Sequence, residues 1–293
     1  MEFSDTQISG KTNVYGLIGD PVDHSMSPLI QNTAFLSSNI DAVYVAFPVR
    51  ASALRSAVQG LLTLGVKGFN VTTPHKVTIM KYLDRLDQYA AQIGSVNTVT
   101  NKNGALSGYS TDGLGAVRAV EEVSRLDEKN VLILGAGGAG KAIAFAFAPK
   151  VGSLKILNRT VSRARDIERR LRKNFQVDVR CEKLTELKIK DFVIGADIVV
   201  NASALGMEGN RELPIRGEWL GPRQLVFEIV YRPIETQLIK RAKQAGAKTL
   251  TGLDMLVHQG ACSFELWTGK KAPVGKMRQA IFQHLRAMSH ASR

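Results

Sequence analysis

The sequence predicts an α/β protein built from two domains. Short apolar runs typical of buried strands alternate with stretches of helical apolar spacing along most of the 293 residues. Near the middle, a glycine-rich turn joins one such strand directly to a helix. A chain of this length can form two domains of ordinary size, each with its own core.

The first half begins with strands expected over residues 14–18, 42–47 and 68–71, separated by helices over 29–36 and 51–64. Pro28 suits the first turn of a helix, so Ser27 is expected to be the N-cap of the first helix. A strand over 94–99, a hairpin turn at Asn103-Gly104 and a helix over 114–123 follow. This order predicts a mostly parallel sheet that binds its ligand at the carboxyl ends of the strands.

Polar side chains follow these strands where a ligand would bind. Asn70, Thr72 and Lys76 lie at the end of the third strand, and Asn97 interrupts the fourth. Asp112 follows the hairpin and is expected to pair with Lys76, because a carboxylate orients an ammonium group and tunes its pKa. Lys76 and Asp112 also have plainer interpretations, as a solvated lysine and a helix cap.

Ser25 and Ser27, just before the first helix, also have two interpretations. Their hydroxyls either cap the helix or present donors to an anionic ligand at its start. The motif alone favours capping.

The second half opens with a strand over 131–134, the turn Gly135-Ala136-Gly137-Gly138-Ala139-Gly140 and a helix over 141–147. The turn fits G-x-G-x-x-G. Gly135 allows the tight turn, Gly137 a close approach of the backbone to a pyrophosphate, and Gly140 close packing of the helix on the strand. The N–H groups and dipole of the helix start attract phosphates. We therefore expect a Rossmann-type dinucleotide-binding domain.

The next strand, over 154–157, indicates which dinucleotide binds. In NAD-binding proteins an Asp or Glu at this strand end binds the ribose 2′-hydroxyl. Here the strand ends in Asn158-Arg159-Thr160, with Arg163 one turn further on. Guanidinium groups bind a 2′-phosphate that an acid would repel, so NADP is expected over NAD.

Strands over 198–200, 225–230 and 249–252 complete this half, and helices over 255–268 and 277–288 follow. Gln259 lies among apolar residues of the first of these helices. A glutamine in that setting is more often a satisfied core amide than a ligand contact.

The composition argues against several classes of protein. The start of the chain is polar and no apolar run approaches membrane-spanning length, so no signal peptide and no membrane partner are expected. Cys181 and Cys262 are too few for a disulfide framework or a cysteine zinc site. The histidines show no metal-ligand spacing. A cytoplasmic protein without a metal is expected.

The net charge is +13, and all of it lies after residue 113. Residues 1–113 carry eight basic and eight acidic side chains, whereas residues 114–293 carry 31 and 18. The basic side chains are dispersed and only 6% of residues are aromatic, which favours a solvated basic surface over nucleic-acid binding. A polyanionic cofactor accounts for a modest part of the excess.

From about residue 14 to residue 269, the chain resembles the shikimate dehydrogenase family, which is NADP-dependent. The resemblance rests on several motifs in the family's order rather than on the glycine turn. These motifs are Ser25-x-Ser27-Pro28, Asn70-Val71-Thr72-x-Pro74-His75-Lys76, Asn97-Thr98, Thr111-Asp112-x-x-Gly115, Asn158-Arg159-Thr160, Asn201-Ala202-Ser203-x-x-Gly206-Met207, Tyr231-x-Pro233-x-x-Thr236 and Gly252-x-x-Met255-Leu256-x-x-Gln259-Gly260.

The resemblance implies the reversible NADPH-dependent reduction of 3-dehydroshikimate to shikimate, in aromatic amino-acid (chorismate) biosynthesis. Lys76 would supply a proton and a positive charge to the developing alkoxide, and Asp112 would orient Lys76. The implied substrate contacts are Ser25, Ser27 and Tyr231 for the carboxylate, and Asn70, Thr72, Asn97, Asp112 and Gln259 for the ring hydroxyls.

Contacts with the cofactor are implied along the second half. They run from the pyrophosphate at the glycine turn, through the 2′-phosphate after the next strand, to the nicotinamide near the last strand. The residues are Gly135, Ala136, Gly137, Gly138, Ala139, Gly140, Asn158, Arg159, Thr160, Arg163, Ser203, Gly252 and Met255.

The resemblance also implies a discontinuous substrate domain, residues 1–113 and 257–293, around an NADP-binding domain of residues 114–256, with a cleft between the two. Two positions depart from the family. Ser110 stands where Asn is usual, and Glu228 stands where Asp is usual.

Three alternatives stay open. The first is a quinate/shikimate dehydrogenase with relaxed substrate or NAD use. The second is a non-catalytic NADP-binding sensor of the same fold, and the third is a basic nucleic-acid binder. The expected partners are small molecules, and the expected state is a monomer or a homodimer.

Overall fold

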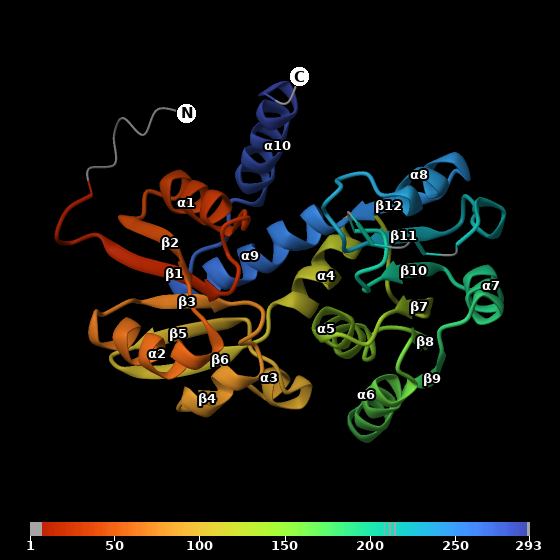
Figure 1. Cartoon of the computed structure of the whole chain (residues 1–293), viewed down its shortest axis with the longest axis horizontal. Coiled ribbons are helices and arrows are strands. Elements are labelled where there is room, and N and C mark those ends of the chain that lie inside the picture. Colours follow the sequence, from red (N-terminus) through yellow and green to blue (C-terminus); the bar gives the residue numbers. More distant parts are fainter. Residues whose placement is uncertain (1–7, 208, 211, 214, 292–293) are drawn as a thin grey trace. The chain divides into compact units, whose positions relative to one another are not determined.

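The computed structural model describes residues 8–291 except 208, 211 and 214, and the chain forms two compact units (Figure 1). The first unit contains the residues up to Thr111 together with those from Val257, and the second is Asp112–Leu256. Within the described residues each unit holds one six-stranded sheet. The predicted two-domain α/β fold is confirmed. The boundary after Thr111 assigns Asp112 to the second unit.

The first sheet combines a parallel part with a hairpin, in the order β2-β1-β3-β5-β6-β4. Its strands are β1 (Asn13–Gly19), β2 (Ala42–Pro48), β3 (Gly68–Val71), β4 (Arg85–Leu86), β5 (Thr98–Lys102) and β6 (Ala105–Tyr109). The pairs β1–β2, β1–β3 and β4–β6 are parallel, and β3–β5 and β5–β6 are antiparallel. Asn103 and Gly104 both have positive φ, 53° and 92°, as the predicted tight hairpin turn requires.

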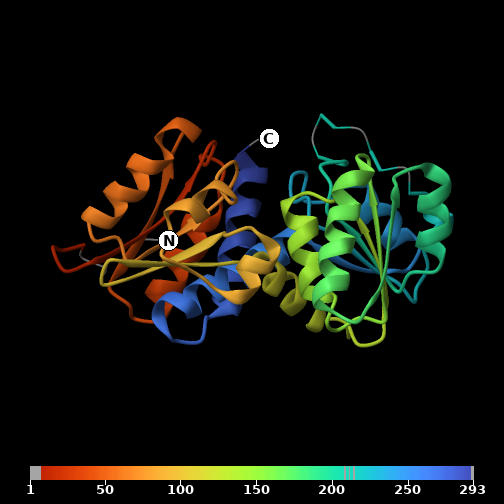
Figure 2. The same cartoon turned by 90° about the horizontal axis from the view of Figure 1, so that it is seen from below.

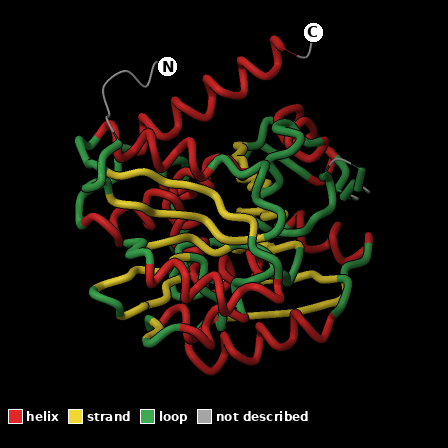
Figure 3. Tube along the Cα trace, turned by 60° about the vertical axis from the view of Figure 1, so that its left-hand side comes forward, coloured by secondary structure: helices red, strands yellow, loops and turns green. Residues whose placement is uncertain are grey.

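Helices pack on both faces of this sheet (Figure 3). They are α1 (Ser27–Ser37), α2 (Leu54–Thr63), α3 (Gln88–Ile93), the second part of α9 (Gly252–Thr268) and α10 (Val274–Ala291), with short 3₁₀ turns at Ala51–Ala53 and Thr78–Tyr82. On one face, the Tyr15 ring lies 5.0 Å from Phe35 of α1 and 5.1 Å from Trp267 of α9, centroid to centroid. On the other, Ile18 packs in a cluster with Leu54 of α2. β1 therefore supplies both cores through the alternation of its side chains.

The second sheet is entirely parallel, in the order β12-β11-β10-β7-β8-β9. Its strands are β7 (Asn130–Leu134), β8 (Ser153–Asn158), β9 (Asp178–Lys183), β10 (Ile198–Asn201), β11 (Leu225–Glu228) and β12 (Lys248–Thr251). This is the strand order of a doubly wound dinucleotide-binding fold. The order reverses between β7 and β10, which is the position where such folds bind their ligand.

Helices lie on both faces of the second sheet as well (Figure 2). They are α4 (Asp112–Glu121), α5 (Gly138–Phe147), α6 (Val161–Asn174), α7 (Glu186–Ile194) and α8 (Gln237–Gln244), with a 3₁₀ turn at Gly217–Trp219. Leu132 and Leu134 of β7 pack in one cluster with Val193 and Leu238 on the side of α7 and α8. α5 and α6 contact β7 and β8.

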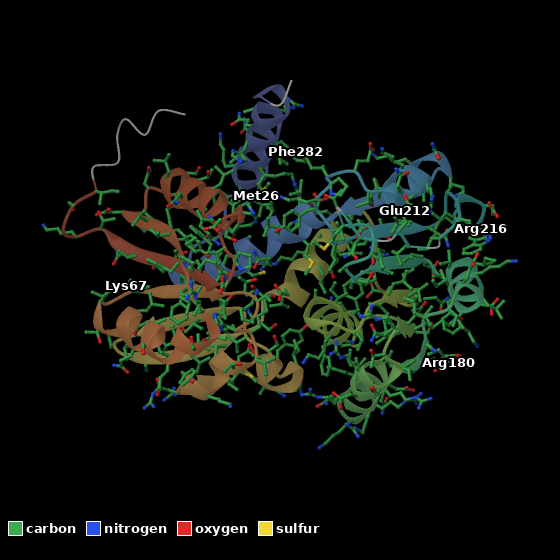
Figure 4. The ribbon with its side chains drawn as sticks, in the orientation of Figure 1. Met26, Lys67, Arg180, Glu212, Arg216 and Phe282 are labelled. Atoms are coloured by element: carbon green, nitrogen blue, oxygen red, sulfur yellow. The ribbon has the colours of Figure 1, made fainter. Side chains whose placement is uncertain are left out.

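Three local predictions differ from the structure. Ser27 is the first residue of α1 and not its N-cap, because Met26 (Figure 4) occupies the cap position in helical conformation, with no side-chain cap. The strand expected from residue 94 begins at Thr98, since Gly94 adopts φ 65° to end α3. The strand expected to reach Val230 ends at Glu228. No helix in the described part of the chain is long and apolar enough to cross a bilayer.

Candidate active site

The loops after β1 and β3 are joined at the carboxyl edge of the first sheet. The N–H of Asp20 donates to the carbonyl of Thr73 over 2.9 Å, and a Cβ on Gly19 would lie only 2.3 Å from the methyl group of Thr72. These two loops carry the predicted site residues Ser25, Thr72 and Lys76, and a fourth, Ser27, begins the helix that follows the first loop. The fold therefore gathers side chains from distant segments at the edge where an α/β sheet binds ligands.

Asn70, the third residue of β3, is buried and makes four hydrogen bonds. Its Nδ2 donates to the hydroxyls of Thr98 and Ser263 and to the carbonyl of Asn97, each over 3.0 Å. Its Oδ1 accepts from the Tyr44 hydroxyl over 2.8 Å. The amide is therefore fixed from both sides before any ligand binds.

Asn97, just before β5, is fixed in the same way. Its Oδ1 accepts from the backbone N–H of Thr111 over 2.7 Å, and its Nδ2 donates to the Thr111 hydroxyl and to Oε1 of Gln259 over 3.0 and 3.3 Å. A backbone N–H can only donate, so the orientation of the Asn97 amide is determined. Asn97 also holds the chain immediately before Asp112.

These bonds form one buried polar network in the first unit. Its members are Tyr44, Asn70, Asn97, Thr98, Thr111, Gln259 and Ser263, and Ser27 adds a hydrogen bond to Tyr44. Burial raises the pKa of Tyr44 well above its usual value, so its hydroxyl stays protonated. The network joins Ser27, Asn70, Asn97 and Gln259, all four of which were predicted site residues.

Two members of the network, Tyr44 and Ser263, escape the sequence analysis, whereas Thr98 and Thr111 appear there only as parts of motifs. The signal for Ser263 was present, because it follows Gln259 by four residues and shares its helix face. Its hydroxyl lies 2.8 Å from that of Thr98 and donates to the Gln259 carbonyl over 3.1 Å. Gln259 therefore belongs to a polar cluster and is not an isolated core amide.

Lys76 is half-buried in the segment after β3. Its carbonyl accepts from the N–H of Val96 over 2.8 Å. The preceding residue, His75, is buried, and its ring nitrogen lies 2.6 Å from the carbonyl of Val49. These bonds fix the backbone that carries Lys76. Asp112 is buried as the first residue of α4, and Tyr231 is half-buried after β11; both belong to the second unit.

The glycine turn of the second unit has the predicted conformation. Gly135 has φ 113°, and a Cβ there would lie 2.6 Å from the carbonyl of Ala202, while a Cβ on Gly140 would lie 2.2 Å from the carbonyl of Gly135. A Cβ on Gly137 or Gly138 would meet nothing within 4 Å. α5 begins at Gly138 without a side-chain cap. An open backbone and an uncapped helix start suit a pyrophosphate.

Asn158, at the end of β8, joins this turn to the next strand. Its Oδ1 accepts from the N–H of Ala136 over 3.0 Å and its Nδ2 donates to the carbonyl of Thr160 over 2.8 Å. Both ends of the Asn158 amide therefore have partners within the protein, and its contact with the 2′-phosphate stays a prediction. Arg159 and Arg163 are exposed, as a phosphate site needs.

The remaining predicted cofactor residues lie after β10 and β12. Ser203 donates to Oδ1 of Asn201 through both its N–H and its hydroxyl, over 3.1 and 2.7 Å. Gly252 and Met255 lie in the first turn of α9, and a Cβ on Gly252 would lie 2.1 Å from the carbonyl of Ile229. Among the described residues no group of three or more side chains is arranged to hold a metal ion.

Three segments of the chain match family models. Residues 17–99 match the shikimate dehydrogenase substrate binding domain, residues 118–206 match shikimate / quinate 5-dehydrogenase, and residues 252–282 match the shikimate 5′-dehydrogenase C-terminal domain. The first segment contains the buried Asn70 and Asn97, and the second contains the glycine turn.

Whole proteins are similar along nearly their full length. The shikimate dehydrogenase (NADP(+)) of Methanocaldococcus jannaschii is 43% identical over 285 residues, 95% of this chain and 99% of that protein. A crystal structure of a shikimate dehydrogenase in complex with NADP⁺ has a TM-score of 0.87 at 41% identity, covering 95% of this chain and 98% of the other. Shikimate 5-dehydrogenase from Listeria monocytogenes, in complex with shikimate and NAD, has a TM-score of 0.89 at 35% identity, with 94% and 98% covered.

Proposed function

We propose that Lys76 and Asp112 carry the chemistry of this chain, which belongs to the shikimate dehydrogenase family. The protein is an NADP-dependent oxidoreductase that acts on a CH–OH group and interconverts 3-dehydroshikimate and shikimate in aromatic amino-acid biosynthesis. The observation that carries the residue assignments is the buried polar network, which holds the amides at the carboxyl edge of the first sheet in one orientation.

The network prepares the substrate site. Asn70, Asn97 and Gln259, with Thr72, bind the ring hydroxyls of shikimate, while Ser25, Ser27 and Tyr231 bind its carboxylate. Each of the three amides is held by neighbours within the network, so little conformational entropy is lost when the substrate binds. A substrate lacking one hydroxyl would leave a polar group of the site unpaired, and this is the basis of specificity.

Lys76 acts as the general acid for reduction. NADPH, when bound, supplies the hydride that reduces the ring carbonyl. The charge that develops on the carbonyl oxygen is stabilised by the ammonium group of Lys76, which then gives its proton to that oxygen. Asp112 accepts hydrogen bonds from the ammonium group and from a substrate hydroxyl, which orients both. In the oxidation of shikimate the amine takes the proton back.

The second unit holds NADP. The N–H groups at the glycine turn, Gly135 to Gly140, bind the pyrophosphate, and Arg159 and Arg163 with Thr160 bind the 2′-phosphate. Asn158 supports both by holding Ala136 and Thr160. Ser203, Gly252 and Met255 lie at the nicotinamide end.

An assay of four substrate pairs tests this function. Purified protein is incubated with shikimate or quinate and with NADP⁺ or NAD⁺, and formation of the reduced nicotinamide is followed by absorbance. We expect the highest kcat/KM with shikimate and NADP⁺. Comparable turnover of quinate or with NAD⁺ would favour the relaxed dehydrogenase, and no turnover with any pair would favour an NADP-binding sensor.

The variant Lys76→Ala tests the catalytic assignment. Removing a general acid typically costs about a hundredfold to ten-thousandfold in rate, so kcat should fall by that range while the shikimate KM changes little. The control is Lys81→Ala, an exposed lysine of the adjacent 3₁₀ turn. Near-normal turnover by Lys76→Ala would show that the assignment is wrong.

We also expect a cytoplasmic protein that is a monomer or a homodimer, with shikimate, 3-dehydroshikimate and NADP as its partners. The low cysteine content supports the compartment.

A further inference from the structure

Glu228 is a buried acid that the catalytic assignment does not use. It is the last residue of β11 and its exposed fraction is 0%. In the sheet register it lies beside Asn201 of β10 and Thr251 of β12. It therefore occupies the carboxyl edge of the second sheet, where the loops that carry Ser203, Tyr231 and Gly252 begin.

The Glu228 carboxylate is the acceptor in each of its described hydrogen bonds. Nδ2 of Asn201 lies 2.9 and 3.0 Å from the two oxygens, the N–H of Val230 donates to Oε1 over 3.0 Å, and the Thr236 hydroxyl donates to Oε2 over 3.1 Å. The Thr236 hydroxyl accepts from the N–H of Ile239, so its own proton is available for the carboxylate. The arrangement fits an anion that accepts from three different residues.

Asn201 links the Glu228 carboxylate to the loop after β10 through its side-chain amide. Its Oδ1 accepts from the N–H of Ser203, a group that can only donate, so its Nδ2 must point to Glu228. The same Nδ2 donates to the carbonyl of Leu205 over 2.9 Å. The position of the Ser203 loop is thus tied to the carboxylate through one side chain.

The adjoining backbone is tied to the glycine turn and to α9. The N–H of Ala202 donates to the carbonyl of Leu134 over 2.8 Å. The carbonyl of Ala202 lies so close to Gly135 that a Cβ on this glycine would be 2.6 Å from it. Ile229 follows Glu228, and its N–H donates to the backbone carbonyl of Asn201 over 3.1 Å. The carbonyl of Ile229 packs against Gly252. Glu228 lies where all of these segments meet.

We infer that Glu228 is a positioning residue for hydride transfer. It holds the Ser203 loop and the start of α9 in the arrangement that binds the nicotinamide end of NADP, and it holds the Tyr231 loop in the arrangement that binds the substrate carboxylate. The inference rests on the proposed function of those three segments. Glu228 touches neither substrate nor cofactor in this role. It acts through Asn201, Val230 and Thr236.

The variant Glu228→Gln keeps the size of the side chain and removes its charge. The new Nε2 can only donate. It faces Nδ2 of Asn201 at either position, together with the Val230 N–H at one position or the Thr236 hydroxyl at the other, so these donors lose an acceptor. We expect the NADP⁺ Kd, measured by titration calorimetry, to rise about tenfold and kcat to fall by a similar factor. Glu228→Asp restores a carboxylate and should stay within about threefold of the wild type in both measurements.

The matched control is Asp197→Asn, at the opposite end of β10. Asp197 also accepts from a backbone N–H, that of Asn130, over 2.9 Å, but it lies at the amino edge of the sheet. A merely structural role for Glu228 would lower the melting temperature and leave the NADP⁺ Kd at 25 °C equal to that of Asp197→Asn. That result would overturn the inference. If the wild type turns over no shikimate, the proposed function fails, while the two Kd values still test Glu228.

A second pair of variants serves if Glu228→Gln does not fold. Thr236→Val removes one hydrogen bond from the carboxylate together with the N-cap of α8, and Thr185→Val removes only the equivalent N-cap of α7. The inference requires a NADP⁺ Kd for Thr236→Val at least threefold above that of Thr185→Val. Equal values would refute it.

Discussion

Asn97 is a single side chain whose hydrogen bonds fix the orientation of donors and acceptors in the candidate site. Its amide has one possible orientation, because the Thr111 N–H must face its oxygen. The donor that remains is turned toward Gln259 and the Thr111 hydroxyl. In the proposed function, a substrate hydroxyl at Asn97 meets a preset pattern of donors and acceptors, and the free-energy cost of ordering these groups belongs to folding rather than to binding.

Ser263→Ala tests this preorganisation. The Ser263 hydroxyl lies within hydrogen-bond distance of Asn70, Thr98 and Thr111, so its loss leaves buried polar atoms with fewer partners. We expect unfolding free energy to fall by about 1–3 kcal/mol and the shikimate KM to rise about threefold to tenfold, with the NADP⁺ Kd unchanged. Steady-state kinetics and urea unfolding provide the measurements.

Thr268→Ala is the control for that variant. Thr268 makes the same bond to the carbonyl four residues earlier, over 2.8 Å, but contacts no member of the buried polar network in the described bonds. Equal shikimate KM values for the two variants would show that Ser263 does not position the substrate amides.

At the scale of elements, two glycines of the glycine turn have different roles: Gly140 allows close packing of the helix, and Gly137 leaves space for the pyrophosphate. Gly140→Ala would place a Cβ 2.2 Å from the Gly135 carbonyl, so it should destabilise the protein by about 3 kcal/mol. Gly137→Ala meets nothing within 4 Å, so it should fold normally and weaken NADP⁺ binding by about tenfold, because its methyl group occupies the path of the pyrophosphate. Melting temperature and titration calorimetry distinguish the two. Normal NADP⁺ affinity in a folded Gly137→Ala variant would contradict this account.

The elements predictable from sequence are those with apolar periodicity. The buried strand β7 and its neighbours β8 and β10 are recognisable in the sequence as apolar runs. β9 does not, because four of its six residues are acidic or basic and Val179 is the one buried side chain among its described positions. Short α3 and two-residue β4 carry too few residues for any period to show.

The site was predictable where a motif follows a strand end, and less so where contacts are long-range. Asn70 is the third residue of β3, and Lys76 lies in the segment that follows this strand. Ser263, by contrast, reaches Asn70 across 193 positions, and Glu228 is an acid in an apolar strand that bonds to Asn201, the last residue of another strand, across 27 positions. No local pattern contains such pairings, since they depend on the order of strands in the sheet.

For the molecule as a whole, Glu228 also makes stability depend on pH. Burial raises its pKa from 4.5 to about 7, although the hydrogen bonds from Asn201, Val230 and Thr236 oppose this. Between these values the folded protein binds more protons than the unfolded chain, so the free energy of unfolding should fall as pH rises through that window, by roughly 3 kcal/mol. The loss continues through the folded-state pKa of about 7 and is complete about one pH unit above it.

Chemical unfolding of the wild type and Glu228→Gln at pH 4.5 to 8 measures this contribution. Among the residues that the structure describes, the charged groups that share a cavity with Glu228 are Glu212, Glu235, Lys240 and Arg241. Arg241 pairs with Glu212 over 2.8 Å, and Glu235 pairs with Lys243 over 2.7 Å, so both other acids already have cationic partners. The difference between the two curves should therefore follow Glu228. Parallel curves would refute its titration in this range.

The interruption of the first unit has a consequence for the order of biosynthesis. All six strands of its sheet precede residue 110, yet Asn70 and Thr98 find their partner at Ser263, and Gln31 bonds to the Gly260 carbonyl across 229 positions. A ribosome releases the complete second unit before it releases those residues. The nascent chain can therefore assemble the second unit first, and the first unit is completed only when the second part of α9 emerges.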